Sequence, residues 1–271
     1  MARGFGSTRG SGTTDKVVTG YSTLTAGPRS YHIWIKRYGD GGGTLGRIWD
    51  TGAAAAVGDE AFFNAGDQTI RFQRQFTGGF AFWGMSWPGG TGTNLGVWFP
   101  IGFAYDASSA SNDPVPYLNG TAQSLNGDSN STGTADTTAN AYCLGNRASD
   151  NARVWDGDLA WWAMWSVILN AAEFAALARG VPAYRIRPQS LLTCCPLFGL
   201  HSPEIDFVKG NASATVTGTA LRTGPPVTMT TPKMVYFTPP ATSPPPPPSG
   251  GIIQRRTHVH LGTRIGSRQV A

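Results

Sequence analysis

Hydrophobic and polar residues alternate with a period of two in a series of short segments along the chain. The clearest is residues 31–36, in which the hydrophobic residues Tyr31, Ile33 and Ile35 occupy every second position. A two-residue period places alternate side chains on opposite faces of a β-strand. The same alternation, or a short hydrophobic run bounded by turn residues, marks residues 46–50, 69–73, 79–83, 97–105, 115–118, 142–147 and 157–165. The pattern predicts an all-β protein built of short antiparallel strands.

One segment carries the signals of a helix instead. Asn170 is a good N-cap residue, Glu173 completes the spacing of a capping box, and helix-forming residues continue to Arg179. Gly180 and Pro182 then end the helix. A single helix among many strands is typical of an antiparallel β-sandwich and argues against a succession of βαβ units.

The composition agrees with a sandwich that has many turns and an aromatic core. The 271 residues include 36 Gly, 19 Pro, 9 Trp and 13 Phe, and only 14% of them are charged, which excludes long charged helices and coiled coils. Cys143, Cys194 and Cys195 are odd in number and two of them are adjacent, so we expect no disulfide framework and a reducing compartment. No hydrophobic run approaches about 20 residues, so we expect no membrane insertion.

Composition changes near both ends of the chain and suggests four parts. Residues 1–20 are rich in Gly, Ser, Thr and Arg and predict a basic N-terminal arm. Residues 21–230 contain the predicted strands and helix, and should form the sandwich without either arm. Residues 231–249 contain a run of five prolines and predict an extended linker. Residues 250–271 hold four arginines and no acidic residue, and predict a basic C-terminal anchoring arm.

The net charge of +5 is concentrated in the two ends, so the sandwich itself is close to neutral. Binding to nucleic acid draws most of its affinity from neutralised phosphates. We therefore do not expect nucleic acid to be a partner of the sandwich. The two basic ends are either solvated tails or contacts to nucleic acid or to an acidic protein surface.

Several longer motifs follow one another in a fixed order across residues 21–180. They are residues 31–36, 46–50, 98–106, 117–120, 144–147 and 155–160, and the helix start at 169–173. This ordered set resembles the laminin-G-like and concanavalin A-like jelly-roll family of lectins and glucanases. The resemblance implies a jelly-roll β-sandwich. It does not specify a function, because the fold carries lectins, glycosidases, adhesion modules and virion proteins.

The combination of such a sandwich with two basic arms also resembles structural proteins of tailed-phage particles. That resemblance implies a virion protein made in the host cytoplasm, with other virion proteins and copies of itself as partners. The residues expected to bind these partners lie in the C-terminal arm, where an added strand with flanking arginines would anchor the chain. They are Arg255, Arg256, Val259, Leu261, Arg264 and Arg268.

Enzymatic activity is not expected. Glycosidases need two carboxyl groups about 5–9.5 Å apart, and the resemblance implies that glucanases of this fold carry them at alternating positions of one strand. The glutamates here are Glu60, Glu173 and Glu204, and none shares a strand with another acidic residue at that spacing. No nucleophile elbow or phosphate-binding loop is present either. We expect no catalytic residue.

The sequence offers weak candidates for a metal site and a glycan site. A structural calcium ion is the one cofactor that the sequence leaves open, and its candidate carboxylates are Asp150, Asp156 and Asp158. The segment from Asp156 to Asp158 is also typical of a turn that leads into a strand. Trp87 stands beside a loop and is the best candidate for an exposed aromatic residue that stacks on a sugar, and Asn119 is the second glycan-binding candidate.

Two functions follow from these observations. The first is a non-enzymatic structural protein of a phage particle, which displays the sandwich on the surface and uses its arms as anchors for capsid decoration or stabilisation. The alternative is a carbohydrate-binding module of a tail or adhesion protein that contacts glycans on a host surface.

Overall fold

The computed structural model describes residues 1–10, 12–52, 58–90, 92–138, 140–199, 202–208 and 211–227. The described residues all lie within one compact unit, residues 1–229. The predicted linker at 231–249 and the predicted C-terminal arm at 250–271 lie outside the described residues.

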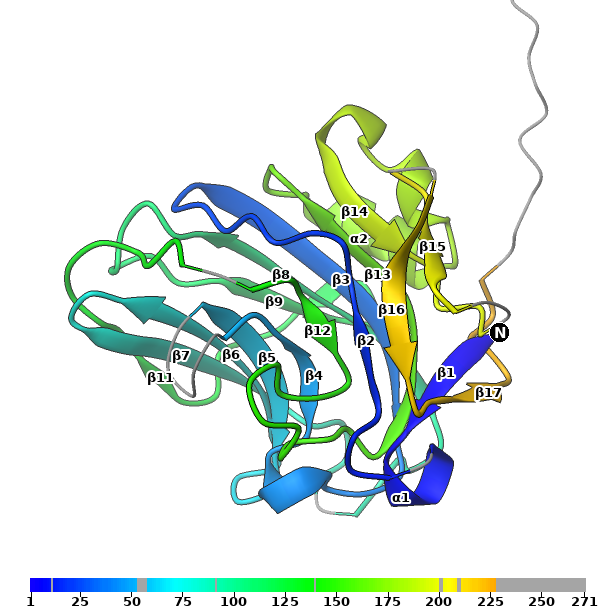
Figure 1. Cartoon of the computed structure of the whole chain (residues 1–271). Helices are drawn as coiled ribbons and strands as arrows, with labels where there is room; N and C mark the ends of the chain where they lie inside the picture. The colour runs from blue at the N-terminus through cyan, green and yellow to red at the C-terminus, as the bar shows by residue number, and fades with distance from the viewer. Residues whose placement is uncertain are drawn as a thin grey trace, which may run out of the picture. The chain divides into compact units, whose positions relative to one another are not determined.

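Two antiparallel sheets pack face to face as a β-sandwich (Figure 1). Sheet A has the strand order β10-β9-β8-β3-β13-β1-β17, and β14 also pairs with β13. Its strands are β1 (Ala2–Phe5), β3 (Pro28–Arg37), β8 (Trp98–Asp106), β9 (Val115–Leu118), β10 (Thr121–Ala122), β13 (Gly157–Trp165), β14 (Leu191–Cys195) and β17 (Ala220–Arg222).

Sheet B has the order β11-β7-β6-β5-β4-β12-β2-β16-β15. Its strands are β2 (Lys16–Val18), β4 (Arg47–Asp50), β5 (Asp59–Asn64), β6 (Thr69–Phe76), β7 (Gly79–Ser86), β11 (Asp128–Ser129), β12 (Cys143–Leu144), β15 (Glu204–Asp206) and β16 (Asn211–Thr217). The predicted antiparallel β-sandwich is therefore confirmed, and every strand segment predicted from the alternation contains a strand of one of the two sheets.

The helices are few and short. They are α1 (Gly6–Arg9), α2 (Ala171–Ala178), η1 (Gly42–Thr44), η2 (Ala183–Arg185) and η3 (Pro188–Ser190). Helix α2 is the one predicted from sequence. Asn170 and Glu173 form the complete capping box, in which each side chain accepts a hydrogen bond from the backbone N–H of the other residue. Within the described residues, no helix is both long and apolar enough to cross a membrane.

The expectation of an N-terminal arm is corrected by the structure. Strand β1 pairs with β13 on one side and β17 on the other, and β2 pairs with β12 and β16. Phe5 and Val17 are fully buried in the core between the sheets. A glycine-rich composition could not reveal this, because neighbouring strands supply the hydrogen bonds and core that these short segments lack alone. A fragment of residues 21–230 would lose both strands.

Aromatic side chains fill the space between the sheets. Trp49 of sheet B stacks on Tyr31 of sheet A with ring centroids 5.4 Å apart, and it meets Trp162 at 5.1 Å. Phe72 extends the same cluster to Trp83, with centroids 6.0 Å apart. These rings hold the two sheets in a fixed relation, since each packs against partners from the opposite sheet.

A carboxylate links the two sheets inside this aromatic core. Asp59 Oδ2 accepts hydrogen bonds from the hydroxyls of Tyr31 at 2.6 Å and Tyr142 at 3.0 Å. The Arg74 guanidinium lies 3.8 Å from the same oxygen, and Asp59 is completely buried. Burial and the negative charge of Asp59 both raise the pKa of the two tyrosines, so they remain protonated donors at physiological pH.

A second layer covers the outer face of sheet A. A β-bulge in β13 lies between Ala160 and Ala163, and Trp161 adopts the left-handed conformation there with φ of 56°. The bulge places Trp161 in an outer cluster with Trp34, while Trp162 remains in the core between the sheets. The outer face of sheet A is therefore covered, whereas sheet B has an open outer face.

We predict that Phe5→Ala lowers the free energy of unfolding of the full chain by about 3–5 kcal/mol, because it empties a fully buried site in the core. Urea unfolding monitored by tryptophan fluorescence measures this. Phe80→Ala removes the same ring from a position that is 42% exposed, and should cost less than about 1 kcal/mol. Equal, small losses for both variants would contradict the placement of β1 within the sheet.

Candidate binding groove

The glycan candidates from the sequence do not form a site. Trp87 is only 2% exposed, and its indole N–H donates to the carbonyl of Thr93 at 3.0 Å. The Arg37 guanidinium lies 4.6 Å from the Trp87 ring centroid. The expectation that Trp87 is exposed is therefore corrected. Asn119 is exposed. It lies in the turn between β9 and β10, at one edge of sheet A, and its backbone is left-handed with a φ of 52°.

The calcium candidates take part in separate interactions. Asp158 is buried on β13 and lies 3.6 Å from the ammonium of Lys36, whereas Asp150 pairs with Arg147 at 2.8 Å on the surface. Asp156 Oδ2 accepts a hydrogen bond from Thr8. Across the described ranges, no group of three or more His, Cys, Asp or Glu side chains is placed to hold a metal ion.

The predicted partner-binding residues lie beyond residue 227 and therefore outside the described residues. They are Arg255, Arg256, Val259, Leu261, Arg264 and Arg268. Their role as an anchor stays a prediction.

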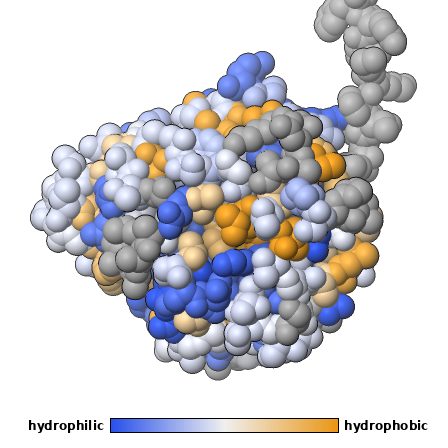
Figure 2. Space-filling view, in the orientation of Figure 1, coloured by the Kyte–Doolittle hydropathy of each residue, from blue (hydrophilic) through white to orange (hydrophobic). Residues whose placement is uncertain are grey.

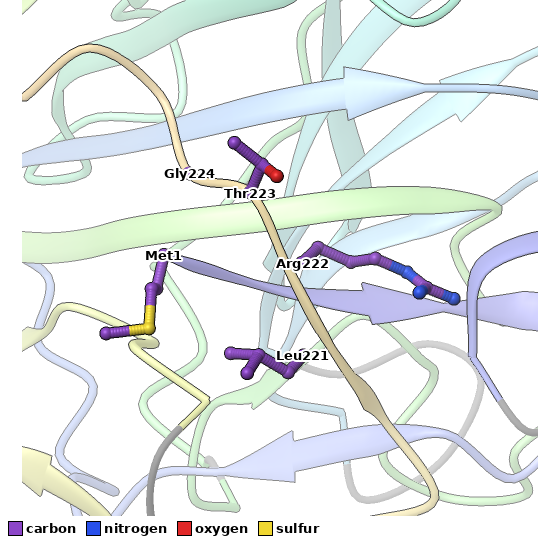
Figure 3. Close-up of a pocket in the computed structure, with 5 residues that line it drawn as sticks. All are labelled: Met1, Leu221, Arg222, Thr223 and Gly224. Carbon is purple, nitrogen blue, oxygen red and sulfur yellow. The ribbon is translucent and has the colours of Figure 1, made fainter.

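One hollow lies at the edge of sheet A, where Met1 meets the end of β17 (Figure 3). The side chains of Met1 and Leu221 are each about half exposed there, at 51% and 50%. The Arg222 side chain extends away from Met1. The described residues that line this hollow offer backbone and aliphatic surface, and none of them is aromatic. A specific small-molecule site needs aromatic surface with a few converging polar groups.

A second hollow has the polar groups that the first one lacks. It is a groove of about 390 Å³ on the open face of sheet B. Figure 2 shows hydrophilic residues gathered on this side of the molecule, in the region where Figure 1 draws β4 and β5. We call it the arginine groove. Its lining residues are Leu45, Arg47, Glu60, Phe62, Asn64, Arg71, Gln73, Phe80, Arg147 and Arg153.

Strand alternation explains why these residues share a face. In β5, Asp59, Ala61 and Phe63 face the core, so Glu60, Phe62 and Asn64 must face outward. In β4 the pairing with β5 shifts between Arg47 and Trp49. This bulge lets both Ile48 and Trp49 enter the core, and Arg47 therefore faces the groove.

Arg47 forms the floor of the groove. Its guanidinium lies 2.8 Å from the Glu60 carboxylate and 3.3 Å from that of Asp50, and it covers the ring of Phe62 at 4.3 Å. The side chain is 5% exposed. Because both acidic partners and the ring fix its plane, Arg47 is a rigid part of the site and is already engaged.

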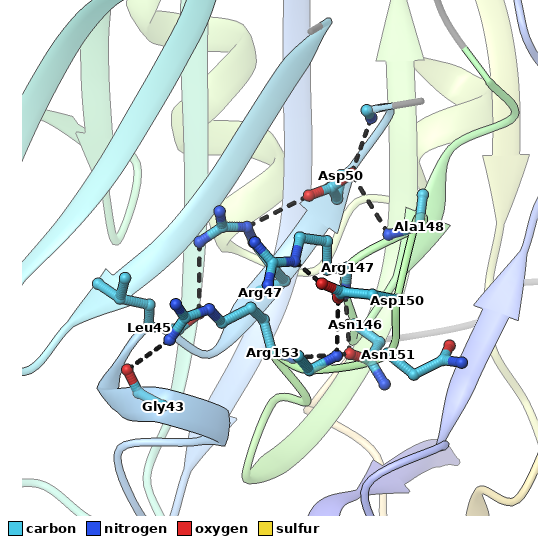
Figure 4. Close-up of polar contacts among 12 residues, drawn as sticks. Gly43, Leu45, Arg47, Asp50, Asn146, Arg147, Ala148, Asp150, Asn151 and Arg153 are labelled. Atoms are coloured by element: carbon cyan, nitrogen blue, oxygen red, sulfur yellow. Dashed lines mark hydrogen bonds and ion pairs between the residues drawn. The ribbon is translucent and has the colours of Figure 1, made fainter. Parts of the chain in front are cut away.

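Two further arginines come from the loop between β12 and β13. Asn146 shapes this loop, because its side-chain oxygen accepts from the backbone N–H groups of Arg147 and Arg153 at 2.8 and 3.1 Å. Figure 4 shows the side chains of Arg47, Arg147 and Arg153 close together. Arg153 donates to the carbonyl of Gly43 at 2.6 Å. Burial, and next the charges of Arg147 and Arg47, lower the pKa of Arg153.

The far wall of the groove comes from β5, β6 and β7. Arg71 forms an ion pair with Asp67, and its guanidinium covers the ring of Phe82 at 4.9 Å. Phe80 is 42% exposed and presents an aromatic ring to solvent. Asn64 and Gln73 supply side-chain amides that can both donate and accept hydrogen bonds.

Two opposing effects act on the pKa of the Glu60 carboxyl group. Burial raises the pKa of this carboxyl group to about 8, and the nearby Asp50 adds to the rise, although Arg47 opposes both. The ion pair with Arg47 alone would favour the charged form, so desolvation is the stronger effect. Burial therefore makes Glu60 a weaker acid than an exposed glutamate, and its ion pair with Arg47 limits this shift of its pKa.

The groove does not have the geometry of a glycosidase. Asp50 and Glu60 are opposite each other in paired strands and share a hydrogen bond. Catalytic pairs stand about 5–9.5 Å apart so that a sugar carbon, with or without a water, fits between them. Asp50 is also 1% exposed and accepts from the backbone N–H of Gly52 at 2.8 Å. It supports Arg47 and cannot reach a ligand.

The comparisons with known proteins identify the fold. No family model matches the sequence, and no curated protein matches it. A candidate carbohydrate-binding protein from Bacteroides ovatus is similar over 84% of this chain, with a TM-score of 0.58 and 14% identity, and the chain spans 61% of that structure. A SAP-like pentraxin from Limulus polyphemus gives a TM-score of 0.43 at 11% identity, over 81% of this chain and 94% of that one.

Domains LG4-5 of the mouse laminin α1 chain give a TM-score of 0.39 at 12% identity, over 58% of this chain and 44% of that one. Together with the two antiparallel sheets, the similarity to the Bacteroides ovatus structure defines a lectin-like jelly-roll β-sandwich. At this level of identity the likeness concerns the fold alone.

We predict that the stability difference between Glu60→Gln and the native chain changes with pH. Since the folded pKa of Glu60 lies above its ordinary value of 4.5, its contribution to stability is complete below that pH and is lost as pH rises through about 8. Glutamine cannot ionise. The free energy of unfolding of Glu60→Gln should therefore rise relative to that of the native chain by on the order of 4 kcal/mol between pH 5 and pH 9.

Urea unfolding at several pH values measures this difference. Gln73→Asn, a change of a neutral neighbour in the groove, serves as the control and should give a constant difference. A flat or falling difference for Glu60→Gln would contradict the raised pKa.

Proposed function

We propose that this chain is a non-catalytic binding module that holds a glycan in the arginine groove. The observation that carries the proposal is the combination of groups in one hollow. The exposed ring of Phe80, the amides of Asn64 and Gln73 and the guanidinium of Arg71 line the same groove of about 390 Å³.

This combination suits the chemistry of a sugar. A pyranose ring has an apolar C–H face that packs on an aromatic ring, and hydroxyl groups that need both donors and acceptors. A groove of this volume lies within the range of small-molecule sites. Strands supply most of the lining, so its side chains are held in place before a ligand arrives.

Two further observations support a binding role over a catalytic one. The Asp50–Glu60 pair is too close for glycoside hydrolysis and is already engaged by Arg47. The Bacteroides ovatus structure with a similar fold is named as a candidate carbohydrate-binding protein. That name supports the proposal only by analogy of fold.

The expectation of a virion structural protein rested on two basic arms. The N-terminal one is replaced by strands β1 and β2, and the C-terminal one lies outside the described residues. A role in a phage particle therefore stays a prediction, whereas the proposal of glycan binding rests on side chains that the structure describes. The two are compatible, because a particle can display a binding module.

We predict that Phe80→Ala lowers the affinity of the full chain for its glycan by roughly five- to tenfold, because it removes the ring on which a sugar packs. A glycan array identifies the ligand, and isothermal titration calorimetry compares the variants. Val97→Ala removes an exposed hydrophobic side chain, 44% exposed, outside the groove and should bind as the native chain does. Unchanged binding by Phe80→Ala would place the glycan elsewhere.

A further inference from the structure

Four arginines line the arginine groove, but their carboxylate partners are unevenly distributed. Arg47 pairs with Asp50 and Glu60, Arg71 with Asp67, and Arg147 with Asp150. Among the carboxylates of the described residues, none forms an ion pair with Arg153. Its one guanidinium hydrogen bond goes to a neutral carbonyl, that of Gly43, and its Nε is buried without a partner.

The groove surface itself is therefore positive. Of its described lining residues, four are arginines and Glu60 alone is acidic. Asp50 is buried beneath the surface, and Asp67 and Asp150 pair with their arginines from outside the lining. Burial raises the pKa of Glu60 and so reduces its negative charge near neutral pH, although Arg47 opposes this shift. A ligand in the groove meets one guanidinium group, that of Arg153, for which the described residues show no ion pair, beside three arginines that are already paired.

The positive charge of the groove is concentrated where the side chains of Arg47, Arg147 and Arg153 lie close together (Figure 4). Like charges at short range repel one another, and a bound anion would relieve that repulsion. Guanidinium groups are suited to this, because their planar fork of N–H donors matches the paired oxygens of a carboxylate or sulfate. Arg153 has donors to offer, whereas Arg47 is held by its own carboxylates.

Resting on the glycan-binding function proposed above, we infer that the groove selects an acidic saccharide. The carboxylate or sulfate of one sugar residue is bound by Arg153 with support from Arg147, and the uncharged part of the saccharide packs toward Phe80. Arg153 is then the residue that distinguishes acidic from neutral glycans, and Phe80 contributes to the binding of both kinds.

Glu60 makes this selectivity depend on pH. The charged groups that face it are Arg47 and Asp50 from β4 and Arg153 from the loop before β13. When Glu60 ionises, it adds a negative charge beside the arginines that bind the anion. An acidic saccharide should therefore bind more weakly at pH 9 than at pH 6, and a neutral saccharide should not change.

The test compares oligogalacturonate with its methyl ester, which has the same sugar chain without the charge. A sulfated galactan oligosaccharide forms a third arm and distinguishes sulfate from carboxylate. Calorimetry with the full chain at pH 6 should show that an acidic form binds about tenfold more tightly than the ester, a difference of about 1.4 kcal/mol. Arg153→Gln should remove most of that difference, chiefly by weakening the binding of the acidic form.

Arg179→Gln serves as the matched control, since Arg179 is an exposed arginine at the end of α2 and outside the groove. Arg153→Lys keeps the charge without the fork and should retain part of the preference, which separates a binding role from a loss of folding. In Glu60→Gln, affinity for the acidic form should stay constant between pH 6 and pH 9.

Three results would overturn the inference. Equal affinity for the acid and its ester would refute it, while the glycan-binding function would stand. Tighter binding of a single-stranded DNA oligonucleotide than of any acidic saccharide, lost in Arg153→Gln, would show a general anion site instead. Absence of binding to every saccharide would refute the proposed function and the inference with it.

Discussion

The buried carboxylate of Asp59 is the constraint on which the rest of the sandwich depends. It joins the sheets through Tyr31 and Tyr142, and it lies opposite Arg74 in a core otherwise filled by aromatic rings. A buried charge is tolerated only where partners satisfy it. Together with Ala61 and Phe63, which also face the core, Asp59 favours the observed register of β5. A slip of one residue would bring Glu60 into the core and turn Asp59 out to solvent.

The same register builds the arginine groove. With Asp59 directed inward, Glu60 and Asn64 face outward beside Arg47 and Arg71 from the neighbouring strands. The bulge in β4 adds to this arrangement, because it turns two successive hydrophobic residues inward and brings Arg47 and Asp50 to the outer face. Most of the groove thus consists of the outward positions of strands whose inward positions form the core, whereas Arg147 and Arg153 come from the loop between β12 and β13. Asn146 fixes the backbone of that loop, and a fixed lining is a condition for selective binding.

The sequence predicts much of the fold because strand alternation and helix capping are local signals. The strand at 31–36 and the helix start at Asn170 are examples in which neighbouring residues decide the structure. Strands β1 and β2 were missed because their stability comes from β13, β16 and β17, far away in sequence. Trp87 was misplaced for a similar reason, since Arg37 and Phe63 cover it. The groove joins residues between 45 and 153, and only strand pairing brings them together.

The central claim, that the arginine groove binds an acidic saccharide, has a direct test in the side-chain Nε–Hε signals of the arginines. The full chain labelled with nitrogen-15 at arginine would be titrated with oligogalacturonate at pH 6 and followed by two-dimensional NMR. The account predicts the largest shifts at Arg153 and Arg147, a smaller one at Arg71, and none at Arg179 or Arg187, which lie outside the groove. Shifts at Arg187 with none at Arg153, or saturable binding that moves no groove arginine, would contradict it.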